Sequence, residues 1–224
     1  MIVKKSPVFW PTLFAVMLVA ALAAPGHAQA QSSPTTAETI EKFFSAWQGI
    51  ETYQCTLTSH EVDGIRVQDR VYHMFFEKPM KTRMEIISGD GRGGAAVWSG
   101  GDTLRGHRGG MLAGIKKTLD IHSPLATSIR GTTIADANYG ILLGHIRTFK
   151  PDNLDAARIG DRTLVTAQVA DPASQAGVTK EVFIFGADGL PLEFEQYQGA
   201  SMVKKVDYSD VKLNVPLPDS LFHI

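Results

Sequence analysis

The sequence predicts an α+β fold made mostly of antiparallel β-strands, and three observations lead to this prediction. Most candidate strands alternate apolar and polar residues, which is the period of a strand with one buried face. Hairpin-length turns rich in glycine join these segments, and such turns connect antiparallel neighbours. Only two stretches have the period of an α-helix, so strands outnumber helices.

Composition limits the class of protein. The chain has 224 residues, 44% hydrophobic and 20% charged, so it can bury a core and is not disordered over its whole length. Lys and Arg number 22 against 23 Asp and Glu, and this balance gives no basic excess for nucleic-acid binding. The single cysteine, Cys55, excludes an internal disulfide framework and cysteine-rich zinc motifs, and we expect a small buried side chain.

Residues 1–30 have the pattern of a secretory signal peptide. Lys4 and Lys5 precede an unbroken apolar stretch over residues 13–24, and Ala28-Gln29-Ala30 offers a cleavage site with small residues. The alternative is a retained membrane anchor, but this stretch is shorter than the about 20 residues that span a bilayer. We predict export, cleavage after Ala30 and one domain over residues 31–224.

The first predicted helix follows directly. Thr35 and Glu38 have the spacing of a capping box, in which each side chain satisfies the other's backbone N–H. Behind them one apolar stripe extends to a helix end near Gly49. The stripe consists of Ile40, Phe43, Phe44, Trp47 and Ile50, a heavy apolar load suited to a curved sheet.

Strand patterns fill most of the remaining chain. Asp63-Gly64 is a plausible hairpin turn, and Lys78-Pro79 ends a strand because proline cannot donate to the ladder. The predicted strands cover residues 53–58, 65–77, 82–87, 95–99, 102–107, 162–169, 180–185, 190–197 and 201–213.

A second helix is predicted over residues 134–148, capped by Thr133 with Asp136 in its first turn. Gly140 and Gly144 lower its helix propensity and allow close approach of another backbone. Residues 111–119 are compatible with a short helical turn but give no clear pattern. Residues 214–222 carry Pro216 and Pro218 and should form an extended, packed tail.

Two predicted strands are apolar on both faces. Residues 71–76 and 182–185 do not alternate, although an antiparallel strand with one solvated face should. One interpretation is a central strand covered on both sides. The other is that one face lines an apolar cavity together with the aromatic residues of the first helix.

Motifs for catalysis or metal binding are weak. Residues 89–94 match G-x-G-x-x-G but open no predicted helix, so a flexible hairpin is the better interpretation. Asp120 and His122 are the only acid–base or metal pair we single out, and an envelope hydrolase that uses them is the enzymatic alternative. The histidines in separate elements lack ligand spacing: His60, His73, His107 and His145. We therefore expect no enzyme, cofactor or metal.

The C-terminal motifs resemble the closing strands of the LolA-like periplasmic lipoprotein carriers. These motifs are Phe183-Ile184-Phe185, Gly189-Leu190-Pro191, Tyr208-Ser209-Asp210-Val211 and the tail over residues 214–222. The stretch from Phe75-Phe76-Glu77-Lys78-Pro79 through the glycine-rich hairpin to Gly140 is similar to a poorly characterised bacterial branch of that superfamily.

The resemblance implies an incomplete antiparallel β-barrel with helices covering a hydrophobic cavity. It implies a periplasmic, non-enzymatic and monomeric carrier that binds the acyl chains of a lipid or lipoprotein and meets donor or acceptor proteins at the two membranes. Lys78 takes the place of an arginine that latches the lid loops in known carriers. The cavity candidates are Phe43, Phe44, Trp47, Tyr72, Met74, Phe75, Phe76, Met84, Phe183 and Phe185. An envelope sensor or scaffold that binds a partner protein with the same fold is the alternative function.

Overall fold

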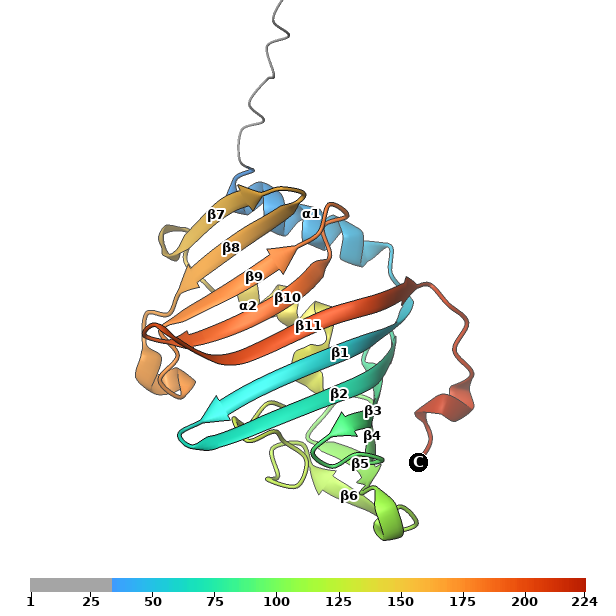
Figure 1. The fold of residues 1–224 in the computed structure, drawn as a ribbon. Coiled ribbons are helices and arrows are strands. Elements are labelled where there is room, and N and C mark those ends of the chain that lie inside the picture. The colour runs from blue at the N-terminus through green and yellow to red at the C-terminus, as the bar shows by residue number, and fades with distance from the viewer. Residues whose placement is uncertain (1–33) are drawn as a thin grey trace, which may run out of the picture. The chain divides into compact units, whose positions relative to one another are not determined.

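Eleven antiparallel strands form one sheet in the computed structural model, which describes residues 34–224 (Figure 1). The strands are β1 (Thr52–Asp63), β2 (Arg66–Glu77), β3 (Lys81–Gly89), β4 (Ala95–Trp98), β5 (Thr103–His107), β6 (Lys116–Asp120), β7 (Leu154–Ile159), β8 (Arg162–Gln168), β9 (Lys180–Phe185), β10 (Pro191–Gln198) and β11 (Ser201–Leu213). Their order across the sheet is β6-β5-β4-β3-β2-β1-β11-β10-β9-β8-β7. The outer strands β6 and β7 are not neighbours, so the sheet is an open, incomplete barrel. The predicted fold class is confirmed.

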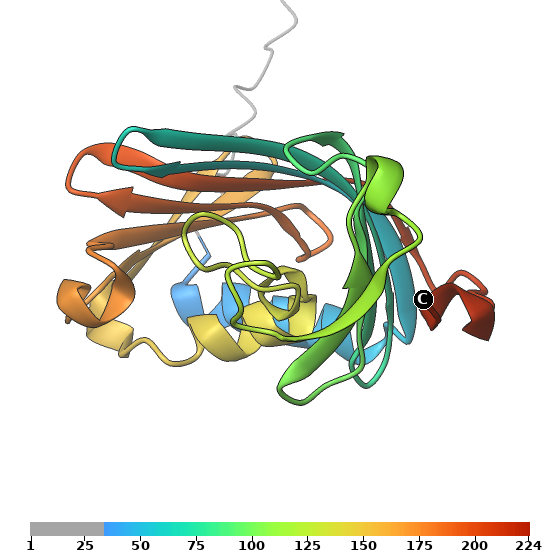
Figure 2. The same cartoon turned by 90° about the horizontal axis from the view of Figure 1, so that it is seen from below.

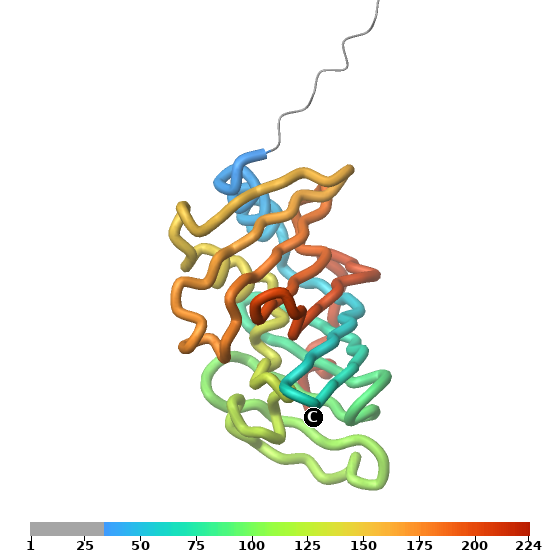
Figure 3. The backbone as a smooth tube through the Cα atoms, turned by 60° about the vertical axis from the view of Figure 1, so that its left-hand side comes forward, coloured from blue at the N-terminus to red at the C-terminus, as the bar shows by residue number. Residues whose placement is uncertain are grey.

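Two α-helices lie inside the curve of the sheet (Figure 2). These are α1 (Thr36–Gln48) and α2 (Tyr139–Ile146). Helix α1 lies beside β7 and β8, as the backbone trace also shows (Figure 3). The short 3-10 segments are η1 (Gly110–Leu112), η2 (Ala135–Ala137), η3 (Pro151–Asn153), η4 (Pro172–Gln175) and η5 (Asp219–Phe222). We call residues 121–138, which precede α2 and lie on the same side of the sheet, the covering loop (Figure 2).

Helix α1 forms as its sequence predicts. The Thr35 hydroxyl accepts a hydrogen bond from Glu38 N at 3.2 Å, and Glu38 Oε2 accepts one from Thr35 N at 2.7 Å. This reciprocal capping box satisfies backbone donors that the first turn of a helix leaves free. The helix ends at Gln48 with Gly49 as its C-cap. Phe43 is completely buried between the helix and the sheet.

Helix α2 is shorter than predicted. Asn138 has an extended backbone, and its side-chain oxygen accepts hydrogen bonds from Gly140 N and Ile141 N. Asn138 is therefore the N-cap of α2. Thr133, the predicted cap, instead donates through its backbone N and hydroxyl to Asp136 Oδ2 at the start of η2. The prediction of one helix over residues 134–148 was wrong because the extended backbone of Asn138 separates η2 from α2, which ends at Ile146.

Strands β6 and β7 were not predicted. Each forms an edge of the sheet and pairs with one neighbour only, β6 with β5 and β7 with β8. An edge strand buries little side-chain surface, so its sequence need not alternate. The unassigned residues 111–119 thus contain the end of η1, a turn over residues 113–115 and most of β6.

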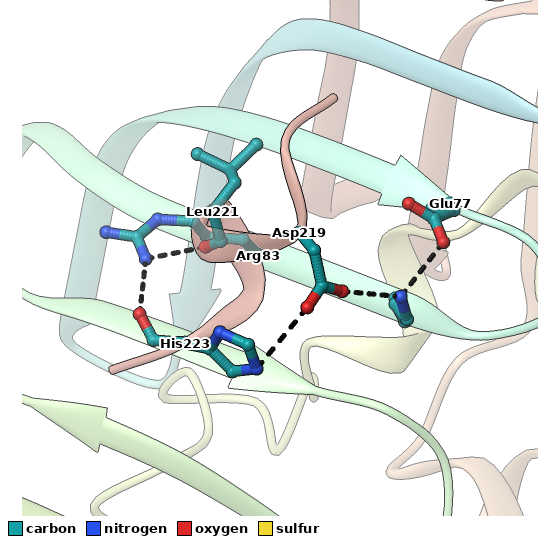
Figure 4. Close-up of polar contacts among 6 residues, drawn as sticks. Glu77, Arg83, Asp219, Leu221 and His223 are labelled. Carbon is teal, nitrogen blue, oxygen red and sulfur yellow. Dashed lines mark hydrogen bonds and ion pairs between the residues drawn. The ribbon is translucent and has the colours of Figure 1, made fainter. Parts of the chain in front are cut away.

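The C-terminal tail crosses the outer face of β3 (Figure 4). Arg83 Nη1 donates to the carbonyl oxygens of Leu221 at 2.8 Å and His223 at 3.4 Å. Lys81 Nζ lies 3.0 Å from Asp219 Oδ1 and 2.9 Å from Glu77 Oε1. The hydrogen bond from Lys81 lowers the pKa of Asp219. The tail is thus extended and packed as predicted, with η5 as an added turn.

The predicted signal peptide lies outside the described residues. Among residues 34–224 no helix has the length and apolar character needed to cross a bilayer.

Candidate functional site

Aromatic side chains on the concave face of the sheet pack against the two helices. Phe43 of α1 contacts Phe185 of β9, with ring centroids 5.5 Å apart, and Trp47 contacts Phe76 of β2 at the same separation. Tyr53 of β1 stacks between Phe76 at 4.9 Å and Tyr139 of α2 at 4.7 Å. These rings form the centre of the main hydrophobic core.

Nine of the ten cavity candidates belong to this core or pack against it. Phe43, Met74, Phe76, Phe183 and Phe185 are buried within it, and Phe44, Trp47, Tyr72 and Met84 are half-buried at its margin. Phe75 alternates to the outer face of β2. There it lines a small outer cavity of about 290 Å³ with His73 and Lys212.

Lys78 holds the C-terminal end of α1. Its Nζ donates to the carbonyl oxygens of Trp47 at 2.9 Å and Gln48 at 3.3 Å. The same atom lies 4.7 Å from the centroid of the Trp47 ring. A cation at a helix C-terminus satisfies free carbonyls and complements the helix dipole. Lys78 thus joins the turn after β2 to a covering helix.

A row of polar side chains crosses one end of the concave face. Glu181, Gln196, Lys204, Glu61 and Gln68 lie on β9, β10, β11, β1 and β2 and are register partners from each strand to the next. We call these five residues the polar row. Glu181 is 0% exposed, Glu61 1% and Lys204 6%. Charged groups buried to this extent require specific partners.

The covering loop supplies partners for one half of the polar row. Thr132 donates its hydroxyl hydrogen to Glu61 Oε1 at 2.7 Å and accepts a hydrogen bond from Lys204 Nζ at 2.8 Å. The backbone N of Arg130 donates to Glu61 Oε2 at 3.2 Å. Thr132 therefore links a buried carboxylate to a buried ammonium group.

Helix α2 supplies the partner for the other half. His145 Nε2 lies 2.6 Å from Glu181 Oε2, and Gln196 Nε2 donates to Glu181 Oε1 at 2.8 Å. Both oxygens of the buried carboxylate are thus bonded. The contact between His145 and Glu181 also connects α2 to β9, next to Phe183 of the aromatic core.

A cavity of about 470 Å³ opens beside the polar row. Ile141 and Leu142 of α2, Phe194 of β10 and Val178 give it apolar walls. Its polar walls include Arg130, Thr132, Asp136, His145, Glu181, Gln196 and Lys204. Its volume lies within the range of about 300–1,000 Å³ that small-molecule sites occupy. The walls are therefore mixed, because Leu142 and Phe194 belong to the main hydrophobic core and other lining side chains are charged.

Two nitrogen donors near this cavity have unused capacity. Within residues 34–224, Lys204 Nζ makes a single hydrogen bond, although an ammonium group has three N–H donors. Arg130 Nε is buried without a hydrogen-bond partner in the same part of the chain. Burial lowers the pKa of Lys204, and the nearby carboxylates of Glu61 and Asp136 oppose that effect.

Burial also controls the titration of the core hydroxyls and the thiol. Burial raises the pKa of Cys55 to about 12, so the thiol stays protonated and unreactive, in agreement with the predicted role as a buried side chain. Burial likewise raises the pKa values of Tyr53, Tyr139 and Tyr208.

The Asp120–His122 pair is part of a turn. Asp120 Oδ1 accepts a hydrogen bond from the backbone N of His122 at 2.7 Å, and both residues are exposed. This contact orders the chain after β6. In the described part of the chain no group of three or more His, Cys, Asp or Glu side chains has the arrangement of a metal site.

The polar row was missed in the sequence, although a pattern for it exists. Glu181 has the same strand parity as Phe183 and Phe185, and Lys204 has that of Val206 and Tyr208. A charged residue on the apolar face of a strand is the exception that marks a possible site. These charged residues come together through the pairing register of five strands. Local sequence patterns do not predict that register.

No known protein family and no curated protein matches the sequence. Solved structures with a similar fold include a LolA superfamily protein from Nitrosomonas europaea, with 15% identity over 86% of this chain and 99% of that chain and a TM-score of 0.42. A DUF1329 family protein from Desulfovibrio piger has 13% identity, coverage of 86% and 98%, and a TM-score of 0.44.

The lipoprotein LppX of Mycobacterium tuberculosis has 10% identity over 80% of this chain and 95% of that chain, with a TM-score of 0.43. The superfamily that the sequence resembles is therefore found among the similar structures. These identities and scores describe a distant likeness, so the function of this chain is inferred from its own residues.

Proposed function

We propose that this protein is a non-enzymatic carrier that binds the acyl chain of a lipid or lipoprotein between α2 and the concave face of the sheet. The observation that carries the proposal is the amphipathic character of the 470 Å³ cavity. Two of its apolar lining residues, Leu142 and Phe194, belong to the main hydrophobic core, and its polar lining includes nitrogen donors with unused capacity.

The apolar lining suits a hydrocarbon chain. Ile141, Leu142 and Phe194 line the cavity, and the ring centroid of Phe194 lies 5.0 Å from that of Phe183 in the core. Transfer of each CH₂ group from water to such surroundings is worth about 0.8 kcal/mol. A ligand chain that enters here would extend toward the predicted cavity residues by separating α2 from the sheet.

The polar lining of the cavity suits the oxygens of an ester or carboxyl head. Lys204 Nζ has two further N–H donors and little competing solvent. A ligand oxygen at this position would offset part of the desolvation of the ammonium group. This chemistry orients the ligand with its head at the polar row and its chain under α2.

The cover over the cavity contacts the polar row through a small set of side-chain and backbone groups. Helix α2 contacts the polar row through His145, and the covering loop does so through Thr132 and the backbone of residues 129 and 130. We infer that α2 and the covering loop move together to admit the ligand. Lys78 would keep α1 in place during this movement, the role we propose for the predicted latch.

Export and a single mature domain belong to the same proposal. Residues 1–30 would direct secretion, and residues 31–224 would act in the periplasm as a monomer. Mass spectrometry of the protein recovered from its native envelope tests the ligand. We expect a co-purified lipid or lipoprotein. A single co-purified protein without lipid would instead favour the sensor or scaffold alternative.

A cavity-filling variant tests the location of the site. Ile141→Trp should block binding of a fluorescent fatty acid because the larger indole side chain occupies space in the cavity that Ile141 lines. Ile159→Trp makes the same change at an exposed position on β7 and should bind like the parent protein. Thermal unfolding of both variants checks that the fold is kept. Equal fatty-acid binding by a folded Ile141→Trp variant would exclude this cavity.

A further inference from the structure

We propose that the loop between β5 and β6 docks the protein on the surface of an anionic lipid bilayer. This docking loop comprises residues 108–115 together with Lys116 and Lys117, the first two residues of β6. Every residue from 110 to 118 is exposed. Met111 is 102% exposed, Ile115 54% and Leu112 46%. Three neighbouring apolar side chains thus extend into solvent from one loop.

Basic residues surround these apolar side chains. Arg105 and Arg108 precede them, and Lys116 and Lys117 follow directly, all four exposed. Between Asp102 and Asp120 the sequence contains no acidic residue. The charge of this segment is therefore positive, although the protein as a whole has a formal net charge of −1.

A second turn adds one more basic residue. Gly109 packs against the backbone of residues 92 and 93 so closely that a Cβ atom there would overlap with Arg92 O. The exposed Arg92 side chain therefore belongs to the same surface. Asp90 is in the same glycine-rich turn. Residues 90–94 and 103–119 together therefore contain five Lys or Arg residues and one acidic residue.

Protection of the sheet edge explains only part of this pattern. Strand β6 is an edge, and lysines on an edge strand discourage pairing with another chain. That role does not account for three exposed apolar side chains beside the lysines. Apolar side chains within a basic surface are typical of segments that lie in the interface of an anionic membrane.

The docking loop is remote from α1 and β7 in both views of the fold (Figures 1 and 3). None of its residues lines the 470 Å³ cavity. Membrane docking and ligand binding can therefore be changed separately, and failure of one proposal leaves the other standing.

Site-directed fluorescence tests insertion of the loop. Cys55 is buried, so in the folded Met111→Cys variant an environment-sensitive fluorophore attaches at residue 111. We expect a blue shift with vesicles of phosphatidylcholine and phosphatidylglycerol, and a smaller one with phosphatidylcholine alone. The matched control is Ile65→Cys, because Ile65 is 101% exposed at a turn flanked by Asp63 and Arg66.

Co-sedimentation with the same vesicles tests the charge. Each basic residue near an anionic surface changes the partition coefficient by about fivefold. Lys116→Gln/Lys117→Gln should therefore weaken binding by about 25-fold at low salt. Lys150→Gln/Lys212→Gln removes the same charge from exposed positions elsewhere and should bind like the parent. Any contribution of residues 1–33 is the same in all these proteins.

Three results would overturn the proposal. The first is an equal blue shift at residues 65 and 111, and the second is equal sedimentation of the two lysine variants. The third is concentration-dependent dimerisation that Met111→Ser/Leu112→Ser/Ile115→Ser abolishes, with no vesicle binding by the parent. That result would assign the docking loop to a second copy of the chain.

Discussion

His145 Nε2 on α2 lies 2.6 Å from Glu181 Oε2 on β9, and the Glu181 side chain is completely buried. The contact joins two residues of the cavity lining, one on a helix and one on a strand. Because Glu181 has only His145 and Gln196 as side-chain partners within residues 34–224, each partner matters for burying its charge. His145 is therefore the side chain through which α2 contacts the polar row.

Replacing His145 with alanine should loosen α2. The buried carboxylate loses one of two partners, which costs about 1–3 kcal/mol of unfolding free energy. Urea unfolding measures the loss, and hydrogen exchange should rise in α2 more than in α1. His122→Ala removes an exposed histidine and serves as the control.

A double-mutant cycle separates this contact from the rest of the fold. Glu181→Gln removes the buried charge that His145 supports, so the cost of His145→Ala should shrink in its presence. Additive losses in the double variant would show that the two residues act independently. That result would contradict the proposed closing contact.

The buried Lys204 should make the unfolding free energy of the protein depend on pH in the alkaline range. Burial lowers its pKa below the ordinary value of 10.5. Between the lowered pKa and 10.5 the unfolded chain binds more protons than the folded one, so the unfolding free energy rises with pH. The raised pKa values of Tyr53, Tyr139 and Tyr208 act in the opposite direction above their ordinary value of 10.

Comparison with Lys204→Met isolates the lysine, because the tyrosines are common to both proteins. The rise in unfolding free energy through that window should be present in the parent and in the exposed control Lys212→Met, and absent in Lys204→Met. Urea unfolding at a series of alkaline pH values measures it. Parallel profiles for all three proteins would show that the ammonium group is not desolvated.

Local patterns in the sequence predict the elements that local interactions determine. The capping box at Thr35 and Glu38 and the stripe around Phe43 define α1 from its first residue to its last. Alternation predicts strands such as β1 because one face lies in the core, whereas β2 contains an apolar run that does not alternate. The same rule fails for β6 and β7, because edge strands bury too little side chain to need alternation.

The candidate site could be predicted only in part, for a physical reason. The aromatic core residues are evident from strand and helix periods, and nine of the ten cavity candidates belong to the main core or pack against it. The polar row depends on the register of five strands. Lys204 and Glu61 are far apart in sequence, and they become partners only when β1 pairs with β11.

Two glycines of α2 should respond differently to alanine. A Cβ atom at Gly140 would lie 2.8 Å from Trp47 Cζ2 and 3.1 Å from Asn138 Oδ1, whereas nothing lies within 4 Å of one at Gly144. Gly144→Ala should therefore stabilise the protein by up to about 1 kcal/mol through helix propensity. Gly140→Ala should be destabilising because it pushes Trp47 out of its contact with Phe76.

Thermal unfolding of the two glycine variants measures the difference, and near-ultraviolet circular dichroism reports the environment of Trp47. Equal stabilisation by both substitutions would mean that α1 and α2 pack less closely than the structure shows.

Lys78→Met should release the C-terminal end of α1. Methionine keeps most of the aliphatic chain but removes the N–H donors to Trp47 O and Gln48 O, so the unfolding free energy should fall by roughly 1–2 kcal/mol. Lys78→Arg retains donors and should recover most of that loss, although the planar guanidinium group differs in shape from an ammonium group. Hydrogen exchange of the amides near Gly49 should rise in the methionine variant and not in the arginine variant. Lys150→Met, at an exposed lysine, controls for the change of net charge. If the methionine variant matches the parent in both measurements, the two carbonyl contacts do not hold α1, and Lys78 loses the proposed role of latch.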